Sequence, residues 1–83
     1  MQIPVLPRAE RKNPMLLELE INDAFELIRS APEVGEAARN TRLAAVRRVL
    51  LKATQYYLYY RADDDEIVML SLWHTSRQRG PRL

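Results

Sequence analysis

The chain has 83 residues, enough for one small domain that buries about 60% of the surface of its unfolded chain and is therefore marginally stable. Hydrophobic residues make up 47% and charged residues 29%, which is typical of a globular protein and argues against disorder. The chain has no cysteine, which excludes disulfides and thiolate metal sites. The apolar stretch Ile67–Trp73 is too short to cross a bilayer and Met1–Pro7 lacks the apolar segment of a signal peptide, so we expect a soluble cytoplasmic protein.

The basic residues are strongly biased toward arginine. The net charge is only +2, but 11 of the 13 basic residues are arginines. The tail after His74 contains Arg77, Arg79 and Arg82 and no acidic residue. Because a planar guanidinium suits phosphates and carboxylates, this bias favours a polyanionic or acidic protein partner. The alternative for any one arginine is a solvated surface side chain with no binding role.

The first third of the chain predicts one helix. Residues 1–12 contain Pro4 and Pro7, so they can supply at most a brief edge strand at Gln2–Leu6. A helix over 13–31 follows, since Asn13 can cap it and Pro14 is tolerated in its first turn. Two sets of apolar residues recur at helical spacing, namely Leu17, Ile21, Ala24, Phe25 and Ile28 on one face and Leu16, Leu19 and Leu27 on a second patch. We therefore expect a helix that ends near Ser30 and buries two sides.

The rest of the chain predicts an antiparallel sheet. Pro32–Thr41 is a loop with one helical turn at Val34–Arg39. Three strands with short connections then form a meander within residues 44–74: Ala45–Leu51, Tyr56–Ala62 and Glu66–Trp73. The helix must cover one face of this sheet, so residues 1–83 form a single two-layer α+β domain, with a basic tail at 75–83.

The side chains that carry chemistry are few. One histidine, no cysteine and no glycine-rich phosphate loop exclude most zinc sites, thiol proteases and P-loop nucleotide sites, and we expect no metal and no cofactor. The acidic run Asp63–Glu66 lacks the ligand spacing of a calcium loop and indicates a solvated hairpin tip. His74 and Ser76 are the residue types of a catalytic triad, but their separation in sequence gives no information on geometry.

The four tyrosines allow two interpretations. Alternation along a strand places Tyr57 and Tyr59 on one face and Tyr56, Leu58 and Tyr60 on the other. A half-buried aromatic sheet face explains them through packing alone. The other interpretation is a stacking surface for RNA bases, flanked by Arg48, Arg61 and Arg77. The pair Trp73-His74 has the same two interpretations.

A series of motifs in the second half of the chain resembles a known family. The motifs are Val46-Arg47-Arg48-Val49-Leu50-Leu51, Tyr56-Tyr57-Leu58-Tyr59-Tyr60-Arg61, an acidic turn, Ile67-Val68-Met69-Leu70, and Trp73-His74 followed by Arg77. Their order resembles the C-terminal half of the RelE/ParE superfamily of toxins from bacterial toxin–antitoxin modules. The helix from Asn13-Pro14 and its exit at Pro32-Val34-Gly35 are also similar to the second helix and following loop of that family. The resemblance covers roughly residues 13–78 and implies a RelE/ParE-like fold.

The N-terminus departs from the family pattern. Members usually begin with a strand and a first helix that forms a hairpin with the second, and only Met1–Lys12 precedes Asn13 here. The chain is then either a shortened member or one whose start has been lost. Either origin leaves one sheet edge or face uncovered, so we expect a partner or self-association, as a homodimer or a toxin–antitoxin hetero-oligomer.

The RelE-like branch of the family cleaves messenger RNA on the ribosome. Its chemistry requires cations for the developing phosphorane charge and a group that moves protons. The resemblance places Arg48 and Arg77 at basic positions of that site. Leu50, Tyr57 and Leu83 stand where that branch has a second lysine, an arginine and a terminal tyrosine, so three of the five expected groups are missing.

The ParE-like branch resembles this chain better. Its members, known from plasmid stabilization modules, generally lack the nuclease residues and are taken to inhibit DNA gyrase by binding, which would make the chain a toxin without enzymatic activity. Both branches imply a cognate antitoxin whose acidic residues meet basic side chains of the toxin. The candidate partner-binding residues are Arg47, Arg61, Trp73, His74, Arg77 and Arg79. A third interpretation is a small scaffold that binds nucleic acid without toxin activity.

Overall fold

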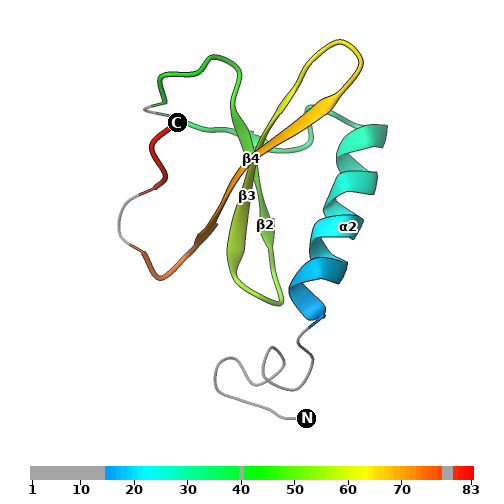
Figure 1. Cartoon of the computed structure of the whole chain (residues 1–83), viewed down its shortest axis with the longest axis vertical. Helices are drawn as coiled ribbons and strands as arrows, with labels where there is room; N and C mark the ends of the chain where they lie inside the picture. Colours follow the sequence, from blue (N-terminus) through cyan, green and yellow to red (C-terminus); the bar gives the residue numbers. More distant parts are fainter. Residues whose placement is uncertain (1–14, 40, 78–79) are drawn as a thin grey trace.

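The computed structural model describes residues 15–39, 41–77 and 80–83. Their elements are helix α2 (Leu16–Ser30) and strands β1 (Glu36–Ala37), β2 (Arg47–Leu51), β3 (Tyr56–Ala62) and β4 (Ile67–His74). The strands form an antiparallel sheet in the order β1-β2-β3-β4 (Figure 1). The expected α+β architecture, with one helix against an antiparallel meander, is confirmed.

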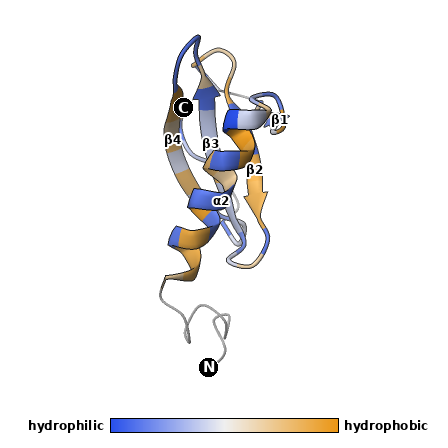
Figure 2. Ribbon diagram, turned by 90° about the vertical axis from the view of Figure 1, so that its right-hand side faces the viewer, coloured by the Kyte–Doolittle hydropathy of each residue, from blue (hydrophilic) through white to orange (hydrophobic). Residues whose placement is uncertain are grey.

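Helix α2 covers one face of the sheet and packs most closely on β2. Figure 2 shows the helix in front of the sheet. The helix ends at Ser30, as expected, and the amide of Ala31 donates to Leu27 O at 2.9 Å. It begins at Leu16 with Met15 at the N-cap position, later than the expected start. Asn13 and Pro14, like the expected edge strand Gln2–Leu6, lie outside the described residues.

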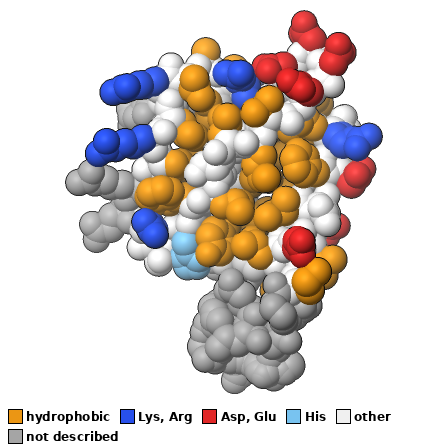
Figure 3. Space-filling model, in the orientation of Figure 1, with side chains coloured by type: hydrophobic (Ala, Val, Ile, Leu, Met, Phe, Trp, Pro, Cys, Tyr) orange, Lys and Arg blue, Asp and Glu red, His pale blue; other side chains and the backbone are white. Residues whose placement is uncertain are grey.

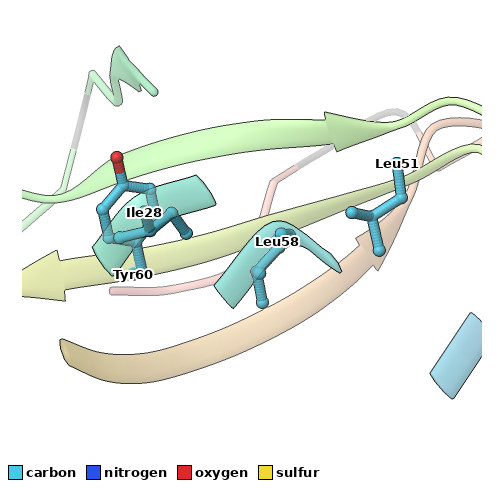
Figure 4. Packing of buried hydrophobic residues seen from close by; sticks show 5 residues of the cluster. Ile28, Leu51, Leu58 and Tyr60 are labelled. Carbon is cyan, nitrogen blue, oxygen red and sulfur yellow. The ribbon is translucent and has the colours of Figure 1, made fainter. Parts of the chain in front are cut away.

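The hydrophobic core forms where α2 meets the central strands. Its buried members are Ala24, Ile28, Leu51, Leu58 and Tyr60. Ile28 from the helix lies over Leu58 and Tyr60 of β3, and all three are 0% exposed (Figure 4). Burying an aliphatic side chain of this size contributes about 1.5–3 kcal/mol, so these few residues supply much of the stability of so small a domain.

Strand β3 alternates between the two faces as predicted. Leu58 and Tyr60 point into the core, and Tyr56 packs against it. The rings of Tyr57 and Tyr59 lie together on the other face, with centroids 6.3 Å apart. A register shift between Tyr59 and Tyr60 marks a β-bulge in the pairing with β4.

Two expectations about local structure are wrong. The segment Val34–Arg39 contains strand β1 rather than a helical turn, because Glu36 and Ala37 pair with β2 and the Ala38 amide donates to Val46 O at 2.9 Å. The second apolar patch of the helix is not buried, since Leu19 and Leu27 are each 50% exposed. The sheet meets only one side of α2, and nothing in the described part of the chain packs over the opposite side.

The hydroxyl of Tyr60 ties β3 to the loop that follows the helix. It donates to Pro32 O at 2.8 Å and accepts from the Gly35 amide at 3.0 Å. Gly35 is required by this close approach, because a Cβ there would lie 2.7 Å from the Tyr60 hydroxyl and 2.8 Å from Arg48 O. This contact fixes the path from α2 into β1, and hence the position of the sheet edge next to Arg48.

A carboxylate on the helix holds the β2–β3 turn. Glu20 Oε1 accepts hydrogen bonds from the Thr54 amide and hydroxyl, at 2.9 and 2.6 Å, and Oε2 accepts from the Ala53 amide at 2.9 Å. Thr54 is fully buried, so these bonds satisfy polar groups that have no access to water. The turn also contains Gln55 with a positive φ of 64°.

Candidate partner-binding surface

Aromatic and basic side chains gather on the sheet face that points away from α2. The antiparallel register aligns Arg48 with Tyr59 and Ser71, and Leu50 with Tyr57 and Trp73. Cross-strand partners point to the same side of a sheet, so these side chains form one continuous surface. We call the set Arg48, Leu50, Tyr57, Tyr59, Ser71 and Trp73 the outer face.

Arg48 lies on the β2 side of this surface and contacts three side chains. Its guanidinium carbon lies 4.0 Å from the centroid of the Tyr57 ring. Nη1 donates to the Tyr59 hydroxyl at 3.4 Å, and Nε donates to Glu36 Oε1 at 2.8 Å. The hydrogen bond to Tyr59 and then the one to Glu36 raise the pKa of Arg48, against the lowering effect of partial burial. The side chain is therefore a fixed cation with its orientation set before any partner arrives.

A second cation–aromatic pair continues the outer face at the end of β4. The guanidinium of Arg77 lies 5.0 Å from the centroid of the Trp73 ring. Trp73 is half-buried, and its Nε1 is shielded from solvent without a hydrogen-bond partner among the described residues. Because Tyr57 is the register partner of Trp73, the two cation–aromatic pairs belong to adjacent strands.

A hollow of about 650 Å³ opens beside Arg48. Its walls come from β1, β2, β3, the loop residues Ala38, Arg39 and Thr41, and the segment Gly80–Arg82. Three arginines from separate parts of the chain, Arg39, Arg48 and Arg82, line it together with Glu36 as the one acid among the lining residues. The main-chain oxygen of Leu83 accepts from the amides of Arg42 and Leu43, each at 3.0 Å, which holds the terminal segment against the loop. This hollow is suited to a carboxylate or phosphate group.

The structure brings some of the predicted binding residues together and separates others. Trp73 lies on the outer face, and Arg77 packs on its ring. Arg48, which the resemblance implies for a RelE-like site together with Arg77, lies on the same face. Arg61 lies near the end of β3, where its Nε is 3.2 Å from Asp63 Oδ1. Arg79 lies outside the described residues.

Arg47 and His74 have their register partners, Tyr60 and Tyr56, on the helix-facing side of the sheet. Arg47 Nη1 donates to Gly35 O at 2.6 Å, which gives this side chain a structural contact. His74 meets the Tyr56 ring edge-on at 5.0 Å, and its Nδ1 lies 2.9 Å from Ser76 Oγ and accepts from the Ser76 amide at 3.1 Å. These contacts close the turn after β4, and none of them involves the carboxylate that a catalytic triad requires.

Sequence reasoning missed Glu36 and Arg39, which help to form the hollow. Glu36 reaches Arg48 only because β1 pairs with β2, and that pairing was not predicted. In the sequence, Arg39 and Arg82 belong to the general arginine bias, and nothing in it indicates that the two side chains lie close together. The two positions expected to carry nuclease cations, Leu50 and Tyr57, are direct register partners, and Leu50 is 39% exposed. At these two positions, where the resemblance implies basic residues, the chain has an apolar side chain and an aromatic ring.

The described residues also limit the chemistry of the surface. Within residues 15–39, 41–77 and 80–83, no three metal-ligating side chains lie close enough to hold an ion. In the same part of the chain, no helix has the length and apolarity needed to cross a lipid bilayer.

The profile of a family described as the ParE toxin of the type II toxin–antitoxin system, parDE, matches residues 9–79. The chain belongs to the ParE toxin family. Comparisons with curated proteins and with solved structures gave no significant match. The RelE/ParE resemblance is thereby confirmed, and family membership implies a type II toxin with an antitoxin partner.

Proposed function

We propose that this ParE-family toxin acts in the cytoplasm by binding DNA gyrase and inhibiting it, and that a cognate antitoxin neutralises it. The observation that carries the proposal is the outer face, where Arg48 is held over Tyr57 at 4.0 Å beside Leu50, a position at which the resemblance to the nuclease branch implies a lysine. The surface supplies binding groups, whereas Leu50 and Tyr57 lack the charge that the nuclease branch would use to stabilise a phosphorane at these two positions.

The outer face has the composition of a binding hot spot. Tryptophan, tyrosine and arginine are the residues that most often dominate the energy of protein interfaces. Arg48 loses little conformational freedom on binding, because Tyr57, Tyr59 and Glu36 already hold it. A partner that covers the surface would also exclude water from the two cation–aromatic pairs, which strengthens them.

The antitoxin is proposed to cover the same surface with an acidic segment. A carboxylate entering the hollow would meet Arg39, Arg48 and Arg82, and charge-assisted hydrogen bonds of this kind are roughly twice as strong as neutral ones. An aromatic or aliphatic side chain beside it would pack on Tyr57 and Trp73. The antitoxin would then neutralise the toxin by competing directly with gyrase for the same residues.

A RelE-like ribosome-dependent nuclease is the second candidate. Arg48 and Arg77 favour it, because Arg48 lies on the outer face, Arg77 packs on Trp73 of that face, and both could stabilise a phosphate there. Leu50 argues against it, since it offers neither charge nor a proton. A non-toxic nucleic-acid scaffold remains a third candidate, and a steep loss of RNA or DNA affinity with added salt would be its signature.

Controlled expression in bacterial cells separates these candidates. We expect growth arrest with induction of the DNA-damage response while translation continues at first, and rescue when the antitoxin encoded beside the chain is co-expressed. Immediate loss of translation would instead indicate messenger cleavage. Harmless expression of a folded chain would contradict toxin activity altogether. Arg48→Ala should abolish the arrest, and Arg29→Ala, an exposed helix position, is the matched control.

A further inference from the structure

A second hollow lies on the other side of the sheet, between α2 and the β3–β4 hairpin. It has a volume of about 860 Å³. Its apolar lining consists of Phe25 on the helix, Pro32 after it, and Ala62 and Ile67 at the ends of the two strands. We call this hollow the hairpin groove. In Figure 3 apolar side chains continue from the hairpin tip down the flank between β4 and α2, so the groove opens onto an apolar surface.

The rim of the hairpin groove is strongly acidic. Its six carboxylates are Asp23, Glu26, Asp63, Asp64, Asp65 and Glu66. Arg29 is the one basic residue among those that line the groove, and its contact with Glu26 is long, 3.9 Å, and largely exposed. Arg61 additionally engages Asp63 at 3.2 Å. Figure 3 shows the acidic side chains gathered around the hairpin tip. This concentration of negative charge occurs in a chain whose net charge is +2.

The hairpin groove is separate from the outer face. None of its lining residues also lines the hollow beside Arg48. The two hollows also have opposite charge, with three arginines in one and six carboxylates in the other. An acidic partner segment is therefore attracted by the hollow beside Arg48 and repelled by the hairpin groove, and a basic segment shows the opposite preference.

We propose that the hairpin groove docks a basic segment of a partner protein, with an apolar side chain seated against Phe25 and Ile67 and lysine or arginine side chains on the acidic rim. Charge complementarity selects this occupant, because like charges placed together at an interface cost several kcal/mol. Nucleic acid and an acidic antitoxin segment are both disfavoured for that reason. The apolar wall supplies affinity that remains when salt screens the rim.

This inference goes beyond the proposed function, since it requires neither gyrase nor toxin activity. Its consequence for regulation is specific. An acidic antitoxin segment on the outer face would leave the hairpin groove free, so a basic partner segment and the antitoxin can occupy the chain together. A basic partner would therefore remain bound when the antitoxin is added, whereas a gyrase contact through the outer face would be displaced.

The test is a nuclear magnetic resonance titration of the isotope-labelled full chain with a short synthetic peptide that alternates lysine and leucine. A glutamate–leucine peptide of equal length is the probe control. We expect the lysine peptide to shift the amides of Asn22–Arg29 and Ala62–Ile67, to leave Arg48 and Tyr59 unaffected, and to bind more weakly as salt is added. The glutamate peptide should leave the groove amides unchanged.

Variants localise the binding energy. Asp64→Asn combined with Asp65→Asn should weaken the lysine peptide roughly fivefold, since each exposed charge contributes a fraction of a kcal/mol. Glu18→Gln combined with Glu33→Gln removes the same charge outside the groove and should leave affinity unchanged. Phe25→Ala should weaken binding, whereas Leu27→Ala, at an exposed helix position outside the groove, should not.

Several results would overturn the proposal. They are equal binding of both peptides, shifts confined to the outer face, and unchanged affinity in the double aspartate variant. Concentration-dependent dimerisation that protects the groove amides would assign the groove to a second copy of the chain. Contacts from residues 1–14 to Phe25 in the free chain would assign it to the N-terminal segment. None of these measurements involves gyrase. A negative peptide titration would therefore not contradict the proposed function, and a negative gyrase assay would not contradict peptide binding in the hairpin groove.

Discussion

The guanidinium carbon of Arg48 lies 4.0 Å above the ring of Tyr57, and this pair organises the outer face. The contact depends on the antiparallel register, which places Tyr57 opposite Leu50 and Tyr59 opposite Arg48. Tyr57 therefore lies diagonally from Arg48 on the same face, within reach of a long side chain. These contacts fix the orientation of the Arg48 side chain, which would otherwise be free to move in solvent.

Replacing Arg48 by lysine should weaken binding of the antitoxin about tenfold, even though the charge is kept. An ammonium cannot stack flat on Tyr57 while donating to both Tyr59 and Glu36. Calorimetric titration of the variant measures the change, and Arg29→Lys is the matched control. Equal affinity for wild type and Arg48→Lys would show that only charge matters at this position.

Replacing Tyr60 by phenylalanine should lower the free energy of unfolding by about 1–3 kcal/mol, because the Gly35 amide and Pro32 O lose their buried partner. Urea unfolding followed by circular dichroism measures the change. Tyr57→Phe is the control, since its ring faces the opposite side of the sheet and should change stability by less than about 0.5 kcal/mol. Similar losses in both variants would contradict the assigned role of the Tyr60 hydroxyl.

Replacing Gly35 by alanine should destabilise the chain by about 1–3 kcal/mol, as expected for overpacking. The new Cβ would lie 2.8 Å from the main-chain oxygen of Arg48, which cannot move without disturbing β2. Gly80→Ala provides the comparison, because its Cβ would meet only the Tyr59 hydroxyl, at 3.4 Å. Thermal unfolding of the two variants should show a clear loss for the first and little change for the second.

Replacing Glu20 by glutamine should cost about 1–3 kcal/mol, since an amide has one oxygen and cannot accept all three hydrogen bonds from Ala53 and Thr54. Glu18→Gln, at an exposed position of the same helix, should be close to neutral. Chemical denaturation of both variants measures the difference. A neutral Glu20→Gln would mean that water replaces the carboxylate at the β2–β3 turn.

Much of the fold was predictable because its signals are local. The strand over Tyr56–Ala62 was predicted with its observed bounds, since tyrosines alternate with core residues and an acidic turn follows. The helix end at Ser30 followed from Pro32. Strand β1 was not predictable in this way, because two residues become a strand only through pairing with β2. The exposure of Leu19 and Leu27 likewise depends on what packs over the helix.

The candidate surface was predictable in composition but not in arrangement. Arg48 and Arg77 were selected from the sequence, and both lie beside aromatic rings. Arg47, the neighbour of Arg48, was predicted to bind a partner, yet it faces the other side and contacts Gly35 O. Alternation along β2 separates the two arginines, and only the burial of Tyr60 opposite Arg47 determines which face each occupies. The hollow itself arises from segments distant in sequence.

The most direct test of the proposed function is a gyrase assay with the purified chain. Relaxed plasmid, gyrase and ATP are incubated with wild type, Arg48→Ala or Arg29→Ala, and both supercoiled product and linear DNA from trapped cleavage complexes are quantified. We predict that gyrase reactions containing wild type or Arg29→Ala form less supercoiled plasmid and accumulate linear DNA. Reactions containing Arg48→Ala should show neither effect, and adding the antitoxin should restore gyrase activity. Undisturbed gyrase, alongside cleavage of messenger RNA on programmed ribosomes by the same sample, would contradict the proposal.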